Sequence, residues 1–296
     1  MSGNKRNTLC MILAMTAPLA HYTGLGYMTV LLAAGAMIPL SILAGDGMNR
    51  IPKPIAALEL IWLGMIMGSL LRVSGENWPG EKSEVVVPLT LLLLGVVTGN
   101  REKAERTCST LFWILLIPAL WILAVLAGKT EIEWLTPRSV AWKGNLIAVL
   151  LYPVIIMSGN GVQIKAGTII ALMAGVLAAL IQGGIGLNQA MVEESPVYEL
   201  GRCIGKGGFE IIISAVLTLS WYGFVSMGMS SSEMLGERMG IRSLGSRVLV
   251  SGFAILGLYS ERMAEDRIII SGVLLLWILV PILNQKNKLK KDEKRC

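Results

Sequence analysis

Two carboxylates lie within or at the edge of long apolar runs, where a charge has the largest chemical consequence. Glu59 stands about one turn into PIAALELIWLG, and Glu210 opens the apolar run that follows Phe209. Charges within membrane hydrocarbon are costly and usually functional, for example in proton or ion transfer. Either carboxylate could instead sit at the boundary between membrane and water. We therefore treat Glu59 and Glu210 as candidates for intramembrane charge.

A second group of polar side chains lies in the apolar run after Glu210. Ser214 and Thr218 share a helix face with Trp221, whereas Ser220 points elsewhere. The shared hydroxyls could bind a substrate or a sodium ion, since hard cations take oxygen ligands. They could equally serve close helix packing, in which small polar residues are common. The sequence leaves both interpretations open.

Motifs for catalysis, metal binding or phosphate binding do not occur in the chain. It has one histidine, His21, and four scattered cysteines with no metal-ligand spacing. It has no acidic pair at catalytic spacing, no HExxH and no GxSxG. The lysine among glycines in CIGKGGFE is not a P-loop, because Gly207 stands where that loop has Ser or Thr. The sequence therefore indicates no enzyme and no cofactor beyond H⁺ or Na⁺ coupling.

The elements that must position these residues are membrane helices. Of the 296 residues, 54% are hydrophobic and 16% are charged, and runs such as TIIALMAGVLAALIQGGIGL (168–187) carry no charge. A soluble core helix would show a polar face, and a membrane span needs roughly 20 mostly apolar residues. We therefore expect an all-α integral membrane protein with about ten transmembrane helices, over residues 8–20, 22–44, 54–71, 85–99, 108–127, 144–158, 166–187, 209–229, 247–259 and 267–283.

The charges outside these runs predict the domain limits and the orientation. Residues 1–285 form a single transmembrane permease domain, and 286–296 form a basic cytoplasmic tail. Alternate connections are rich in Lys and Arg, which places both termini in the cytoplasm. The sequence pI near 9.2 comes largely from the tail, so we expect no nucleic-acid partner. The first segment also has the features of a cleaved signal peptide, which charge cannot exclude. Trp78 fits an aromatic belt near the outer face.

Ten spans divide into five plus five, the arrangement of transporters built from inverted repeats. The first helix of each half is interrupted in such folds, and Pro18 and Pro153 lie in the first and sixth segments. Proline removes a backbone donor, and broken backbone is tolerated where it lines a cavity. The alternative is simple kinking of two helices.

The stretch SPVYELGRCIGKGGFE, followed by IIISAVLTLSWYGFV, resembles the loop and eighth helix of spore-germination permeases. These are the B-subunit membrane components of germinant receptors, in the amino acid/polyamine/organocation (APC) superfamily. A weaker likeness covers the fifth helix and its flanks, over 99–137. The signature loop is carried by Pro196, Tyr198, Glu199, Arg202, Gly208 and Phe209.

The resemblance implies a LeuT/APC-like fold with a substrate pocket between broken helices 1 and 6, flanked by helices 3 and 8. The connection that contains the signature would act as a lid near the substrate entrance. Half-helix ends in the pocket can meet a carboxylate and an ammonium group. The implied pocket residues are Thr16, Ala17, Pro18, His21, Leu151, Tyr152, Pro153, Ser214 and Thr218.

The function implied is germinant recognition in the bacterial cell membrane or the spore inner membrane. The chain would bind, and could transport, a small amino acid-like germinant. It would work with an A-type membrane subunit and a lipoprotein, within the lipid bilayer. An ordinary H⁺- or Na⁺-coupled amino acid or polyamine permease is the main alternative, and a membrane scaffold without transport is a third.

Overall fold

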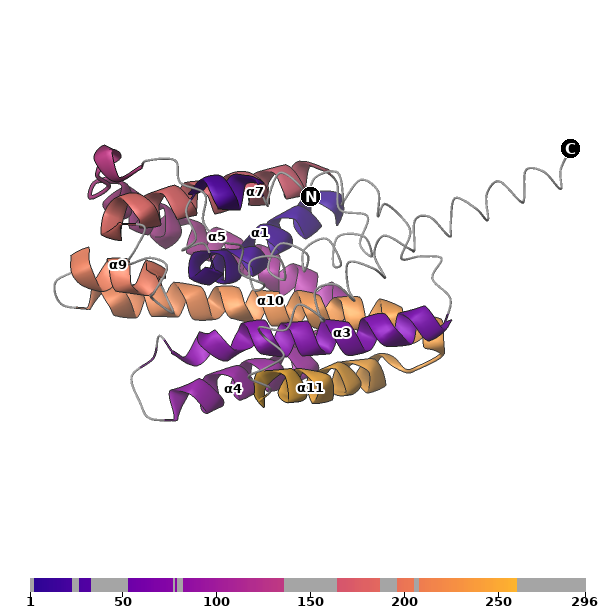
Figure 1. The fold of residues 1–296 in the computed structure, drawn as a ribbon. Helices are drawn as coiled ribbons and strands as arrows, with labels where there is room; N and C mark the ends of the chain where they lie inside the picture. Colours follow the sequence, from indigo (N-terminus) through magenta and orange to yellow (C-terminus); the bar gives the residue numbers. More distant parts are fainter. Residues whose placement is uncertain are drawn as a thin grey trace, which may run out of the picture.

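The computed structural model describes residues 3–22, 27–32, 53–76, 78, 82–135, 164–186, 196–204 and 208–259, and every regular element in these ranges is helical (Figure 1). The all-α expectation is confirmed for them. The expected spans at 144–158 and 267–283, most of 22–44 and the basic tail lie outside the described residues. The principal elements are α1 (Gly3–Tyr22), α3 (Lys53–Leu71), η2 (Arg72–Gly75), α4 (Ser83–Thr98), α5 (Arg101–Ala127), η3 (Ile132–Trp134), α7 (Ile164–Ile185), α9 (Pro196–Ile204), α10 (Phe209–Met239) and α11 (Ser243–Tyr259).

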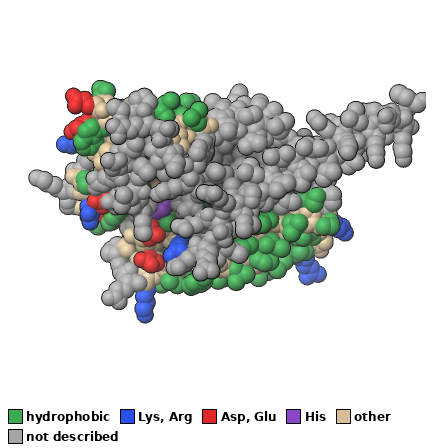
Figure 2. All heavy atoms as spheres, in the orientation of Figure 1, with side chains coloured by type: hydrophobic (Ala, Val, Ile, Leu, Met, Phe, Trp, Pro, Cys, Tyr) green, Lys and Arg blue, Asp and Glu red, His purple; other side chains and the backbone are tan. Residues whose placement is uncertain are grey.

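Among the residues that the structure describes, three stretches are long and apolar enough to cross a membrane: α3 with η2, α5, and α10. Hydrophobic side chains dominate the described part of the face in Figure 2 along the layer of α3 and α11, and Lys, Arg, Asp and Glu gather toward its two ends. An apolar belt between charged ends is the surface that a bilayer selects. The protein is therefore a helical membrane protein.

Helix α10 lies between two groups of helices. It packs on α3, α4 and α11 on one side and on α1 and α5 on the other, with α7 against α1 (Figure 1). It is 31 residues long, which makes it roughly 46 Å at 1.5 Å per residue. The sequence predicted an end near 229, and the structure extends the helix to Met239. The additional turns are mostly buried, so tertiary packing holds them where hydropathy gave no signal.

Glycines set the close packing of α3 on α11. A Cβ added at Gly68 would overlap the carbonyl group of Ala254, and one at Gly257 would overlap the carbonyl of Met65. Gly64 faces α11 one turn before Gly68, with the space for a Cβ taken by backbone and side chain. Small residues spaced by four let two membrane helices approach until their backbones touch. The GMIMG sequence of α3 thus builds a dry interface.

A buried ion pair joins the neighbouring ends of four helices. Arg247 Nε of α11 lies 3.2 Å from Glu233 Oε1 of α10, and both side chains are about nine-tenths buried. Arg247 Nη1 donates to the carbonyl of Val96 in α4, and the backbone N–H of Arg101 in α5 donates to Glu233 Oε2. Ser243 Oγ donates to Glu233 Oε1. The carboxylate and the guanidinium therefore each have several partners, which offsets their removal from water.

Candidate functional site

The first helix runs through its proline without an unwound segment. The expectation of an interrupted helix is wrong in that form, because α1 is continuous from Gly3 to Tyr22 with Pro18 inside it. Pro18 still has no N–H to give to the carbonyl of Ala14. Thr16 Oγ1 donates to the carbonyl of Ile12, four residues earlier. The backbone of this turn is therefore altered in its hydrogen bonding rather than in its helical path.

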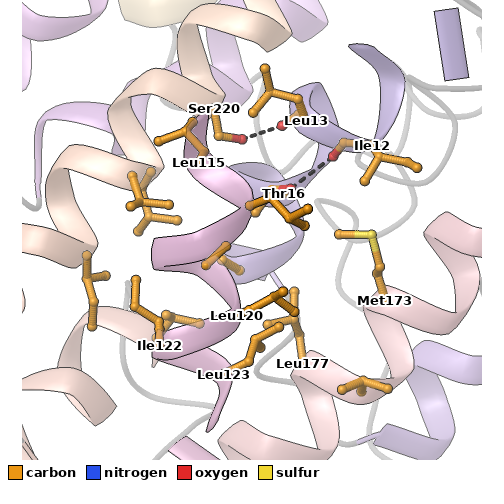
Figure 3. Close-up of a pocket in the computed structure, with 18 of the residues that line it drawn as sticks. Ile12, Leu13, Thr16, Leu115, Leu120, Ile122, Leu123, Met173, Leu177 and Ser220 are labelled. Atoms are coloured by element: carbon orange, nitrogen blue, oxygen red, sulfur yellow. Dashed lines mark hydrogen bonds between the residues drawn. The ribbon is translucent and has the colours of Figure 1, made fainter. Parts of the chain in front are cut away.

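A hydroxyl from α10 reaches into this same turn. Ser220 Oγ accepts from the backbone N–H of Ala17 at 2.8 Å and donates to the carbonyl of Leu13. Leu13 and Ala17 are the i and i+4 residues that bond each other in an ordinary helix. Ser220 is fully buried, so the two bonds form away from water. We name this arrangement the Ser220 clamp (Figure 3).

Ser220 is a site residue that the sequence pattern does not identify. The pattern did place it on a different face of the helix from Thr218, and the structure confirms this. The signal that could have found it is a buried hydroxyl on an otherwise apolar face, since such a group needs a hydrogen-bond partner. Its partner is backbone in a helix distant in sequence, which no local pattern reveals.

Ser214 and Thr218 are occupied by hydrogen bonds within the protein. Ser214 Oγ donates to the carbonyl of Glu210, and Thr218 Oγ1 donates to the carbonyl of Ser214. Thr218 Oγ1 also accepts from the indole N–H of Trp78 at 2.7 Å. Trp78 thus ties the connection after η2 to α10, a role that an aromatic belt does not include. This geometry favours the packing interpretation of the two hydroxyls.

The structure separates the two candidate carboxylates. Glu59 is 7% exposed in the second turn of α3, and its Oε2 has no hydrogen-bond partner within the described ranges. Glu210 is half-buried in the first turn of α10. A negative charge at that position interacts favourably with the helix N-terminus. Glu59 is therefore the buried carboxylate, and Glu210 has the simpler structural role.

Part of the expected signature loop is a helix. Residues Pro196–Ile204 form α9, and Val197 and Leu200 are buried while Arg202 is exposed and pairs with Glu199 at 2.9 Å. The helix contacts α1, α5, α7 and α10. Tyr198 is half-buried.

The step from the signature into α10 depends on one glycine. Gly208 has a φ of 101° and is the N-cap residue of α10. Only glycine adopts this region readily, which explains the residue type at this step. Phe209 is buried and packs edge to face on Trp121 of α5, with ring centroids 5.2 Å apart.

The remaining predicted residues are placed as follows. His21 is half-buried in the last turn of α1. Leu151, Tyr152 and Pro153 lie outside the described residues. Among the residues that the structure describes, no group of three or more His, Cys, Asp or Glu could hold a metal ion.

A cavity of about 460 Å³ lies beside the Ser220 clamp, between α1, α5, α7 and α10, with Val197 of α9 also in its lining. Thr16 and Ser220 are the two polar side chains among the described residues that line it, and the rest of the lining is hydrocarbon. Figure 3 shows Thr16 and Ser220 beside α1, with Ile122, Leu123 and Leu177 further along the cavity. The volume lies in the range of small-molecule sites.

These features define a helical membrane protein with a hydrogen-bonded helix crossing next to an apolar cavity. No protein-family model matches the chain, and no curated protein matches it significantly.

Proposed function

We propose that the chain is a spore-germination-type permease that binds a small amino acid-like germinant. The fold would be a five-plus-five inverted repeat of about ten spans, with both termini in the cytoplasm. An A-type membrane subunit and a lipoprotein would be its partners in the bacterial cell membrane or the spore inner membrane. The proposal rests on the resemblance of the signature stretch and on one observation, the Ser220 clamp.

The clamp supports ligand binding because a side chain of α10 occupies a backbone donor and a backbone acceptor of α1 that would otherwise bond within the helix. An amino acid has a carboxylate, which needs N–H donors, and an ammonium group, which needs oxygen acceptors. The turn offers the N–H of Ala17 and the carbonyls of Leu13 and Ala14 within one stretch of backbone, because Pro18 supplies no N–H to Ala14. A ligand that replaces the Ser220 hydroxyl would find both kinds of group together.

A binding measurement on the full chain in lipid nanodiscs tests the proposal. Thermal shift against the common amino acids, followed by titration of the best ligand, should give a saturable response. Ser220→Ala should weaken that binding by about tenfold, because the Ala17 N–H and the Leu13 carbonyl then bond each other and the turn closes. Ser226→Ala is the matched control, since Ser226 is also buried in α10 and its Oγ has no partner among the described residues.

Two results would contradict the proposal. Absence of a shift with every amino acid at high concentration would argue for a membrane scaffold. Equal affinities in Ser220→Ala and Ser226→Ala would remove the clamp from the binding site.

Glu59 favours a second candidate, the ordinary proton-coupled permease. A buried carboxylate in a membrane span with one oxygen unpartnered within the described ranges is suited to carry a proton. In proteoliposomes, Glu59→Gln should lower proton-gradient-driven amino acid uptake by at least about tenfold while ligand binding persists. Glu210→Gln is the control and should leave uptake unchanged. Uptake that ignores the gradient in the unaltered protein would exclude coupling.

A further inference from the structure

The cavity beside the Ser220 clamp is unsuited to the zwitterion of the proposed function. None of the described residues that line it carries a charge, and its walls are side chains of Leu, Ile, Val, Met, Phe and Ala apart from Thr16 and Ser220. An ionised carboxylate or ammonium group placed there would lose its hydration without gaining a counter-charge. The cavity therefore calls for a different chemical class of ligand.

We propose that this cavity is a second binding site, which takes one neutral aliphatic alcohol from the membrane. The volume of about 460 Å³ is roughly three times that of an engineered apolar cavity that holds benzene. It therefore has room for on the order of ten to twenty non-hydrogen atoms. A single medium-length chain fits that space.

The hydroxyl groups of the lining decide the polar end of the ligand. Thr16 Oγ1 uses its proton on the carbonyl of Ile12, and Ser220 Oγ uses its proton on the carbonyl of Leu13. Both oxygens keep lone pairs, so each can accept a hydrogen bond but has no proton left to donate. A ligand hydroxyl can donate to them, whereas a carboxylate can only accept and finds no donor.

The exposed rim of the cavity indicates how the ligand enters. Leu120 of α5, and Leu172 and Val176 of α7, line the cavity and are each more than half exposed. In a helical membrane protein such apolar side chains face the hydrocarbon of the lipid. The site therefore opens to the bilayer between α5 and α7, and its ligand arrives dissolved in the membrane.

Photolabelling of the full chain in phosphatidylcholine nanodiscs tests this site. The probe is decanol with a diazirine on its tail, and peptide mapping locates the adducts. We expect adducts on lining residues of α5 and α7, and at least a fivefold reduction by excess decanol. Decanoate and decylammonium at the same concentration should compete poorly.

Ala119→Phe should fill the site, because Ala119 lines the cavity. It should reduce the labelling at least fivefold. Ala124→Phe is the control, since Ala124 is on the same helix, exposed and not part of the lining. Amino acid binding is also measured on Ala119→Phe and should persist, since the backbone groups of the proposed amino acid site are on α1 and the substitution is on α5. This keeps the test separate from the proposed function.

Three results would overturn the proposal. Labelling that is spread over exposed α4 residues such as Leu93 and is unchanged in Ala119→Phe would show general membrane partitioning only. Equal competition by decanoate would contradict the assigned polar end. Labelling of the cavity by a phosphatidylcholine with a diazirine in its acyl chain, unaffected by decanol, would assign the space to bilayer lipid.

Discussion

The two sides of α10 are built differently. On the side of α3, α4 and α11, helices α3 and α11 meet through glycines in contact with backbone. A buried ion pair joins α10 to α11 there and also bonds to α4 and to the first residue of α5. On the side of α1, α5 and α7 the helices enclose a cavity. There the Ser220 hydroxyl of α10 bonds the backbone of a single turn of α1. Dense packing resists rearrangement, while a cavity leaves space for repacking. The difference indicates a fixed side, α3–α4–α11, and an adaptable side, α1–α5–α7.

Removing one member of the buried ion pair should destabilise the fixed side more than any other change considered. Arg247→Met leaves Glu233 buried without its cation and should lower the free energy of unfolding by about 3–5 kcal/mol. Adding Glu233→Leu to Arg247→Met should restore much of the loss, because no buried charge then remains. Denaturation of the solubilised protein measures both. Arg106→Met is the control, since its pair with Glu102 is largely exposed, and a loss as large there would show that any lost charge has this effect.

Adding a single methyl group at the α3–α11 interface should have the next largest effect on stability. Gly68→Ala places a Cβ against the carbonyl of Ala254 and should cost about 1–3 kcal/mol through forced separation of the helices. Gly252→Ala on α11 adds its methyl where nothing lies within 4 Å, so it should be neutral or slightly stabilising. The same unfolding measurement compares them. Equal stability of the two variants would mean that the fixed side is not closely packed.

Hydropathy was sufficient to predict the helical class and the approximate location of most described helices. It did not predict α9 as a helix, because nine residues are too few for a search based on runs of roughly 20 apolar residues. The apolar residues of α9 do recur at helical spacing. Hydropathy also missed the last turns of α10, where Ser230, Ser231 and Ser232 interrupt the apolar run but are buried by neighbouring helices. Length and apolar character are local properties, whereas this burial is tertiary.

The candidate site was less predictable than the fold. Thr16, Ala17 and Pro18 do lie at the crossing of α1 and α10. The sequence could indicate this turn because a proline inside a span alters the hydrogen bonding of the backbone. The spacing of Ser214 and Thr218 predicts a shared face, but their hydroxyls bond within α10 and to Trp78. Ser220 and the Glu233–Arg247 pair depend on contacts between distant parts of the chain. Spacing within one helix finds a shared face, but it does not reveal which neighbour that face meets.

Removing the hydrogen bond between Trp78 and Thr218 should have the smallest effect on stability, and it tests the difference between the two sides of α10 most selectively. The bond attaches the connection after η2 to α10, close to Ser220 but on the fixed side. Trp78→Phe removes the indole donor, while Thr218 keeps its own bond to the carbonyl of Ser214. The loss should therefore be about 0.5–1.5 kcal/mol, the net contribution of one hydrogen bond.

A double-mutant cycle with Thr218→Val isolates that contribution from the general effect of losing a tryptophan. Trp113→Phe on α5 is the control for the aromatic change, since Trp113 is exposed on the described surface. A coupling energy of about 1 kcal/mol between positions 78 and 218 is expected, because the two groups touch. If the coupling is zero, the bond does not hold the connection. The connection after η2 would then belong to the fixed side through its attachment to α4, and not through the part of α10 next to Ser220.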